Sequence, residues 1–234
     1  MDIHKPKAVH NWREFVNEIG VIVIGVLIAL GAEQTVESLH WAHEVEAQRL
    51  SLTEEARDSL GSVARRRIQQ PCVDRRLSEI HLLLERHSRQ QPLGIVGTFA
   101  SPTRAGSARG TWDIALSGQA LPHMSQAERI KFSGAFGTFA VWQELSDREN
   151  AIWARLSLLN DVGLLNEADW SALRAAYAEA VEVNDERRNF ATFALQSVGR
   201  ELLGIEAAPV ASNATYASLD RQICKPYVAV AGPK

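Results

Sequence analysis

The sequence predicts an all-α protein in which an N-terminal transmembrane helix continues into an antiparallel bundle of about four helices. The first observation is a run without any charge from Ile19 to Ala32. The second is that apolar residues after Gln34 recur three and four positions apart, the spacing that gives a helix one buried face. Only residues 226–231 approach the alternation of a half-buried strand.

Length and composition leave room for an anchor beside one sizeable domain. The chain has 234 residues, of which 46% are hydrophobic and 23% charged, and its formal net charge is -3. A charge balance this ordinary gives no indication of a polyanionic partner. We therefore expect no nucleic-acid partner.

The flanks of the uncharged run indicate that it spans a membrane. Its 14 residues would cover only ~21 Å as a helix, short of the ~30 Å hydrocarbon core. Trp12 and Trp41, however, are 29 residues apart, which is ~43 Å of helix and matches a bilayer with its headgroups, where tryptophans gather. We expect a transmembrane helix over residues 15–36 in the lipid bilayer, with Trp12 and Trp41 at its two interfaces.

The charges beside this helix predict its direction. Lys5, Lys7 and Arg13 precede it, whereas the stretch 33–52 carries four glutamates and Arg49 as its single basic residue. Basic residues remain on the cytoplasmic side of a membrane. We expect a cytoplasmic tail over residues 1–14 and a periplasmic main domain, anchored in a bacterial inner membrane.

Two other interpretations of the run remain open. Ala29-Leu30-Gly31 is a tolerable cleavage site for a signal peptide, and a buried helix of a soluble protein can have the same length. The leader contains Glu14 and Glu18, and no turn residue follows until Gly61. These features favour a retained anchor.

Four residues inside the expected span are candidates for contacts within the membrane. Glu18 and Glu33 would lie just inside its two edges, and we expect both to reach the headgroups; contact with a polar partner or a part in proton movement is the alternative. Gly25 and Ala29 form a small-x-x-x-small pair, which permits close contact with another helix.

The bundle is expected over residues 37–204. The first helix continues the anchor to about Gln69, Pro71 ends or kinks it, and a second helix follows over 73–87. A long connection, 91–110, leads to a short helix at 111–118. The residues expected on the buried faces of the first two helices are Leu50, Ala56, Leu60, Val63, Leu77, Ile80 and Leu84.

Two long helices complete the predicted bundle. Ser125 and Glu128 form a capping box that opens the first, Asn166 begins the second, and Gly204 lies near its end. After it, residues 205–234 are expected as an extended tail. The inward residues are expected to be Phe132, Phe136, Phe139, Trp142, Leu145, Ile152, Leu156 and Leu159 on one helix, and Trp170, Leu173, Tyr177, Ala180, Phe193 and Val198 on the other.

Cys72 and Cys224 are the two cysteines of the chain. In an oxidising compartment, a single long-range disulfide is the economical interpretation. It would fasten the C-terminal tail to the helices around Pro71.

The segments EIGVIVIGVLIALGAEQ (18–34), GTWDIALSGQALPHMSQAE (110–128) and ENAIWARL (149–156) resemble a group of uncharacterised bacterial single-pass inner-membrane proteins. These share a G-V-L-I-A-L anchor with a glutamate seven positions before its glycine, and a T-W pair before a helical segment. The resemblance implies a membrane anchor and a helical periplasmic domain, and assigns no site residue.

No motif in the sequence names a reaction, and neither a nucleophile elbow nor a phosphate-binding loop occurs. Glu37-x-x-His40 has the spacing of di-iron bundles but lacks a second such pair. The arginines at 65–67 and 75–76 alternate with acidic residues and are expected on a solvated face. We expect no catalytic residue, cofactor or metal ligand.

The expected function is therefore that of a non-enzymatic interaction module or a subunit of an inner-membrane complex. Its partner would be another membrane or periplasmic protein, or a second copy of the chain. The alternative is a periplasmic ligand-sensing domain that relays its signal through a partner membrane protein. A metal-dependent enzyme ranks last.

Overall fold

The computed structural model describes residues 12–207 and 220–229, and these form an all-α protein, which confirms the predicted class. Strand pairing in these residues is limited to one isolated bridge between Ile95 and Val228. The helices in chain order are α1 (Trp12–Ser88), α2 (Gly110–Ser117), α3 (Ala120–His123), α4 (Gln126–Leu156), the 3-10 helix η1 (Ser157–Leu164), α5 (Glu167–Phe193) and the π-helix η2 (Ala194–Leu203).

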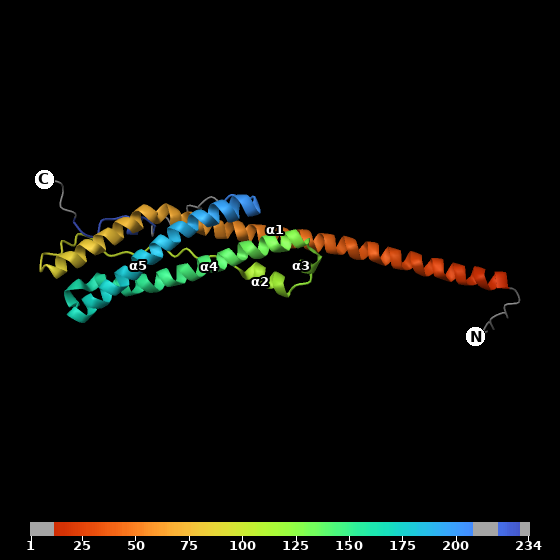
Figure 1. The fold of residues 1–234 in the computed structure, drawn as a ribbon, viewed down its shortest axis with the longest axis horizontal. Helices are drawn as coiled ribbons and strands as arrows, with labels where there is room; N and C mark the ends of the chain where they lie inside the picture. The colour runs from red at the N-terminus through yellow and green to blue at the C-terminus, as the bar shows by residue number, and fades with distance from the viewer. Residues whose placement is uncertain (1–11, 208–219, 230–234) are drawn as a thin grey trace.

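Helix α1 is 77 residues long and belongs to two environments. Its N-terminal part extends alone, and its C-terminal part packs with α4 and α5 (Figure 1). The large apolar side chains from Phe15 to Leu39 are exposed, with no other part of the described chain covering them. By length and composition, α1 is the one helix among the described residues that is able to cross a membrane.

Of the two expected effects of Pro71, an end or a kink, the structure shows that the helix does not end there: the separate helix expected over 73–87 is the continuation of α1. Pro71 lies inside α1, and Figure 1 shows α1 bending where its orange part gives way to yellow. A proline removes one backbone hydrogen bond and pushes the preceding turn aside, which bends a helix that packing holds on both sides.

Helix ends follow the local sequence. Ser125 accepts a hydrogen bond from the backbone of Glu128, whose side chain accepts one in return, so the predicted capping box is formed. Asn166 and Asp169 form a second box at the start of α5. Gly204 ends η2 in the left-handed conformation, with φ 67°, which glycine adopts without strain.

The core is built from inward faces of the three long helices and is divided into two main clusters. One surrounds Ile80, Ile152 and Leu173; the other surrounds Leu60 and Phe136. Trp142, with Val63, Ala191 and Ala194, lies in a small cluster of its own. Most residues predicted to point inward belong to these clusters.

Leu50 and Phe193 were predicted inside, but their side chains are 58% and 49% exposed. The buried face of α1 at this level carries Leu52 beside the predicted Ala56. Val198 lies five residues after Phe193, in the π-helix η2. The structure buries Val198.

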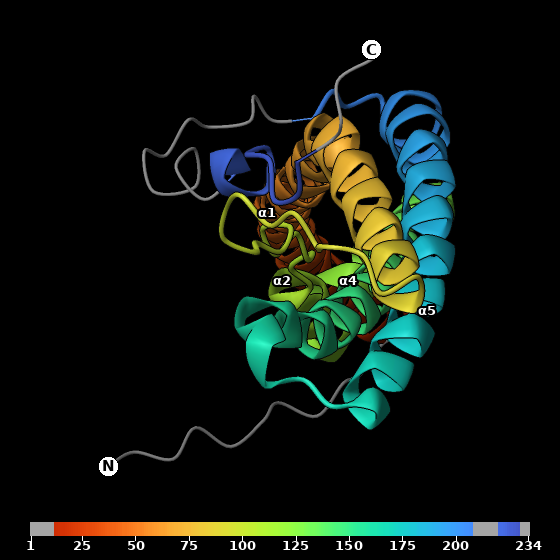
Figure 2. The same cartoon turned by 90° about the vertical axis from the view of Figure 1, so that its left-hand side faces the viewer.

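The C-terminal segment 220–229 packs beside α1, on the side away from α5 (Figure 2). It meets the connection 89–109: Val96 N donates to Tyr227 O at 3.0 Å, and Ala229 N donates to Gly94 O at 2.8 Å. Gly97 permits this approach, because a Cβ there would collide with the carbonyl oxygen of Pro226. The rest of the predicted tail, 208–219 and 230–234, lies outside the described residues, as does most of the predicted cytoplasmic tail.

Candidate functional site

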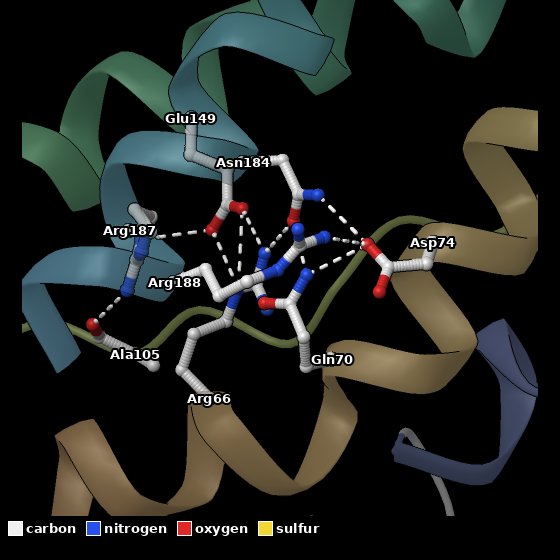
Figure 3. Close-up of polar contacts among 8 residues, drawn as sticks. All are labelled: Arg66, Gln70, Asp74, Ala105, Glu149, Asn184, Arg187 and Arg188. Carbon is white, nitrogen blue, oxygen red and sulfur yellow. Dashed lines mark hydrogen bonds and ion pairs between the residues drawn. The ribbon is translucent and has the colours of Figure 1, made fainter. Parts of the chain in front are cut away.

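A layer of polar side chains crosses the bundle between its two main apolar clusters. Arg66 of α1 and Arg187 of α5 both bind Glu149 of α4 (Figure 3). Arg66 Nη2 lies 2.8 Å from Glu149 Oε1, and Arg187 Nη1 lies 2.8 Å from Oε2. The side chains of Arg66 and Arg187 are each 1% exposed, and that of Glu149 is 4% exposed. We call Arg66, Glu149 and Arg187 the arginine triad.

A hydrogen-bonded chain connects the triad to the surface. Arg66 Nη2 donates to Asn184 Oδ1 at 2.8 Å, and Asn184 Nδ2 donates to Asp74 Oδ1 at 2.9 Å. Arg188 Nη2 lies 2.6 Å from the same Asp74 oxygen at the edge of the bundle. Gln70 donates to both Asn184 and Asp74. The network thus joins α1, α4 and α5 from the interior to solvent.

Arg187 has a second set of contacts. Its Nη2 donates to the carbonyl oxygen of Ala105 in the connection, at 2.9 Å, and its guanidinium lies 4.0 Å from the centre of the Trp142 ring. Burial lowers the pKa of Arg187 to about 10, against the favourable charge of Glu149. Arg187 is therefore still protonated at neutral pH, and the triad holds two cations on one anion.

The triad corrects the expectation that the arginines at 65–67 and 75–76 form a solvated face. Arg66 and Arg76 are buried, although Arg67 and Arg75 are exposed. The carboxylate that binds Arg66 is 83 residues away on another helix. A signal was present, because Arg66 and Glu149 both interrupt an apolar stripe at helical spacing. Charges at stripe positions of different helices indicate a buried pair.

A second cluster fastens the C-terminal segment to α1. Cys72 and Cys224 form the predicted disulfide, with Cα atoms 4.7 Å apart and 152 residues between them in sequence. One turn further along α1, Arg76 binds Glu79, with Nε 2.9 Å from Oε2. Glu79 Oε1 accepts a hydrogen bond from the backbone of Tyr227 at 3.1 Å. We call these five residues the C-terminal clamp.

Arg76 is the centre of the clamp. Its Nη atoms donate to three carbonyl oxygens, those of Ala100, Ile223 and Lys225. Its guanidinium lies beside the rings of Phe99 and Tyr227, 5.6 and 5.3 Å from their centroids. Burial lowers the pKa of Arg76, and the pairing with Glu79 opposes that shift. One buried cation thus joins α1, the connection and the C-terminal segment.

The connection also walls an open groove of about 910 Å³. Residues 99–104 and 106–108 line it, together with Gln143 of α4 and Gln222 of the C-terminal segment. Arg104, the one charged residue in the lining, pairs with Asp147 at 2.8 Å. Most of the groove's surface is apolar, with hydroxyl and amide groups such as those of Ser107 and Gln143 at a few points, which is the usual mixture of a small-molecule site.

The residues predicted for the membrane lie on the protruding part of α1. Trp41 lies at the base of the bundle, where its ring stacks on His123 of α3 with centroids 3.9 Å apart and planes 11° apart. Gly25 has no neighbouring atom within reach of an added Cβ. The structure leaves the other residues of this group exposed and away from any other helix. They are Trp12, Glu18, Ala29 and Glu33.

Glu37 and His40, which have the spacing of a di-iron motif, are not met by metal-ligating side chains from another described helix. Glu37 accepts a hydrogen bond from Trp41 Nε1 at 3.3 Å. Within residues 12–207 and 220–229, no group of three or more His, Cys, Asp or Glu side chains is placed to hold a metal ion.

Both polar clusters connect segments of the chain through buried ion pairs and hydrogen bonds. Glu149 and Glu79, the buried carboxylates, are each engaged by a guanidinium, so neither is placed to accept a proton from a substrate. Buried pairs of this kind hold segments in one register. The clusters define a rigid helical bundle on an exposed apolar helix.

The chain matches no protein-family model, no curated protein and no solved structure. The resemblance to bacterial single-pass membrane proteins therefore stays an expectation from the sequence.

Proposed function

We propose that this protein is a non-enzymatic interaction module or complex subunit of a bacterial inner membrane, with its N-terminus in the cytoplasm and its bundle in the periplasm. One observation carries the proposal: an exposed apolar stretch of α1 continues without a break into a well-packed bundle. Exposing so many Ile, Val and Leu side chains to water is unfavourable, whereas a bilayer accommodates them.

Two further features support this arrangement. The bundle begins at Trp41 and Val45, directly after the apolar stretch, so its base would lie at the membrane surface. The disulfide in the clamp suits an oxidising compartment such as the periplasm. Because both polar clusters hold the helices in one register, a partner would meet a preformed surface.

Reporter fusions test the topology. Alkaline phosphatase fused after Lys234 should be active in a bacterial host, because it folds only in the periplasm, and a green fluorescent protein fused there should stay dark. The reverse pair of results would contradict the proposed direction. N-terminal sequencing of the membrane-extracted protein should begin at Met1 or Asp2; a start at Ala32 would show a cleaved signal peptide instead.

Native mass spectrometry of the gently extracted protein tests the role as a subunit. A second protein component at fixed stoichiometry, or a second copy, is expected. A chain that is monomeric at every detergent concentration, with no bound component, would contradict it.

The groove beside the connection favours a second candidate, a periplasmic ligand-sensing domain that relays its signal through a partner membrane protein. A groove of about 910 Å³ has the size of a small-molecule site. Under this alternative the same spectra would show a small molecule of constant mass, and Ser107→Trp would remove it. Ser107 lines the groove and donates to Phe139 O at 2.6 Å.

A further inference from the structure

Another pocket lies at the end of the bundle that is farthest from the apolar stretch of α1 (Figure 1). It has a volume of about 580 Å³, and Figure 2 shows this end of α1 beside α5. The polar residues that line it come from the end of α1, the first part of the connection and α5, and they are His87, Ser88, Gln90, Gln91, Glu167 and Arg174. We call it the distal pocket. Its lining shares no residue with that of the groove.

The distal pocket contains a carboxylate and a guanidinium from the same helix. Glu167 and Arg174 are seven residues apart on α5, which is about two turns, so both lie on one face with ~10.5 Å between their Cα atoms. Within residues 12–207 and 220–229, no side chain forms an ion pair with Arg174. The guanidinium is therefore available to an anionic group of a ligand.

His87 lies against the carboxylate of Glu167. The His87 ring stacks on Trp170, with centroids 3.9 Å and planes 11° apart, and its Nε2 lies 3.3 Å from Glu167 Oε1. The Glu167 side chain is still 82% exposed, so a ligand can reach its other oxygen. Helix α1 also ends here, at Ser88, and the carbonyl groups of a last helical turn carry partial negative charge. This end of the pocket thus favours an ammonium group.

Gln90 follows the end of α1 in a conformation that glycine adopts more easily. Its φ is 55°, and among the described residues no other non-glycine residue has a positive φ. Many helices have a glycine at this place, because a Cβ is unfavourable there. Residues held in such conformations are frequent at ligand sites. Here the glutamine adds an amide group, which can donate and accept hydrogen bonds, to the wall of the pocket.

We propose that the distal pocket binds a free α-amino acid, with the ammonium group of the ligand on Glu167 and its carboxylate on Arg174. A guanidinium binds a carboxylate through two parallel hydrogen bonds. Contacts of ~2.8 Å at each end, with ~2.5 Å from the nitrogen to the carboxyl carbon between them, add up to ~8 Å. A span of that length fits between two side chains whose Cα atoms are ~10.5 Å apart.

The inference goes beyond the proposed function and does not depend on membrane anchoring, because the pocket lies at the opposite end of the bundle. It adds a ligand to the helix that carries the apolar stretch. His87 and Ser88 belong to α1, which is one continuous helix from Trp12 to Ser88.

A thermal-shift screen of the detergent-solubilised full chain tests the proposal, with each common L-amino acid at millimolar concentration as the probe. At least one should raise the unfolding temperature, since a ligand stabilises the folded state that binds it. The N-acetyl derivative of that amino acid lacks the ammonium group and its amide lacks the carboxylate, so both should have no effect. A screen in which no amino acid raises the unfolding temperature, or in which the derivatives act as strongly as the amino acid, would overturn the proposal.

Arg174→Gln and Glu167→Gln test the two assigned contacts by calorimetric titration with the amino acid that the screen identifies. Each variant should bind at least about tenfold more weakly, because each loses a charge-assisted hydrogen bond. Arg155→Gln is the matched control, since Arg155 is an exposed cation that pairs with Glu179 on the surface, and its affinity should equal that of the wild type. Unchanged affinity in either pocket variant, or an equal loss in the control, would overturn the assignment.

Two further measurements keep these results distinct. Arg174 has no ion pair in the described chain, so the ligand-free Arg174→Gln chain should unfold at the wild-type temperature, and its weaker binding then reports a lost contact with the ligand. Cell fractionation tests the anchoring separately. A chain that is in the membrane fraction and binds no amino acid contradicts only this inference, whereas a chain that binds one and is absent from the membrane contradicts only the anchoring.

Discussion

Arg66 of α1 and Glu149 of α4, which are 83 residues apart in sequence, form a buried ion pair at the centre of the bundle, with 2.8 Å between Nη2 and Oε1. Arg187 of α5 binds the other oxygen of the same carboxylate. One anion therefore holds the three long helices at one level. Its removal should have a larger effect than that of any surface charge.

Glu149→Gln is expected to destabilise the bundle strongly. The amide leaves the guanidiniums of Arg66 and Arg187 buried without their shared countercharge, and removal of one partner from a buried pair costs about 3–5 kcal/mol. Urea unfolding of the detergent-solubilised chain, followed by tryptophan fluorescence, measures the loss. Glu186→Gln is the matched control, because Glu186 pairs with Arg148 on the surface and should cost less than about 1 kcal/mol. Equal losses of unfolding free energy in the two variants would show that the triad stabilises the bundle no more than a surface ion pair does.

Removal of the disulfide should lower stability while leaving the fold intact. The bridge closes a loop of 152 residues, and the loop-entropy model gives up to about 5 kcal/mol for a closure of that length. The Cys72→Ser, Cys224→Ser variant should unfold at lower urea with unchanged helical circular dichroism. In the wild type, denatured protein should react with a thiol reagent only after reduction. Labelling before reduction would contradict the bridge.

Arg76→Lys should loosen the C-terminal segment. A lysine ammonium cannot reach the three carbonyl oxygens that the guanidinium binds. Amide hydrogen exchange at Tyr227 and Ala229 should become at least about tenfold faster, which corresponds to a loss of ~1.4 kcal/mol. Arg67→Lys, on the exposed side of the same helix, should leave these amides unchanged. Unchanged exchange in Arg76→Lys would show that the disulfide alone holds the segment.

Tyr227 should make stability fall at high pH. Burial raises the pKa of Tyr227 to about 12, whereas an unfolded tyrosine titrates near ~10. The folded state thus keeps a proton that the unfolded state loses, so this contribution is complete below pH ~10 and is lost as the pH rises through about 12.

The Tyr227→Phe variant isolates that effect. Arg187, with a pKa lowered to about 10 by burial, acts in the opposite direction, but it is common to both proteins and cancels in the difference. The difference in unfolding free energy between wild type and variant should therefore change between pH 10 and 12, and ultraviolet titration should lose its latest tyrosinate step. A constant difference across this range would contradict a buried phenol.

Short-range features of the fold could be predicted because their causes lie within a few residues. The capping box at Ser125, the start of α5 at Asn166 and the end of η2 at Gly204 depend on residues within one turn. Pro71 shows the limit of such rules. Its local effect is to bend α1, and packing of the helix on both sides keeps it continuous.

The sequence by itself determined the helical class, the exposed apolar helix at the N-terminal side and the pairing of Cys72 with Cys224. Helical periodicity and chain composition carry that information, and two cysteines allow one intramolecular bridge. Only the tertiary structure decided which charges are buried. Arg66, Glu149 and Arg187 lie on three helices, and a charge is stable in the core only where another segment supplies its counterion. Interrupted apolar stripes mark Arg66 and Glu149 as candidates for burial, but which charges meet depends on how the helices pack against one another, and no local pattern in the sequence specifies that.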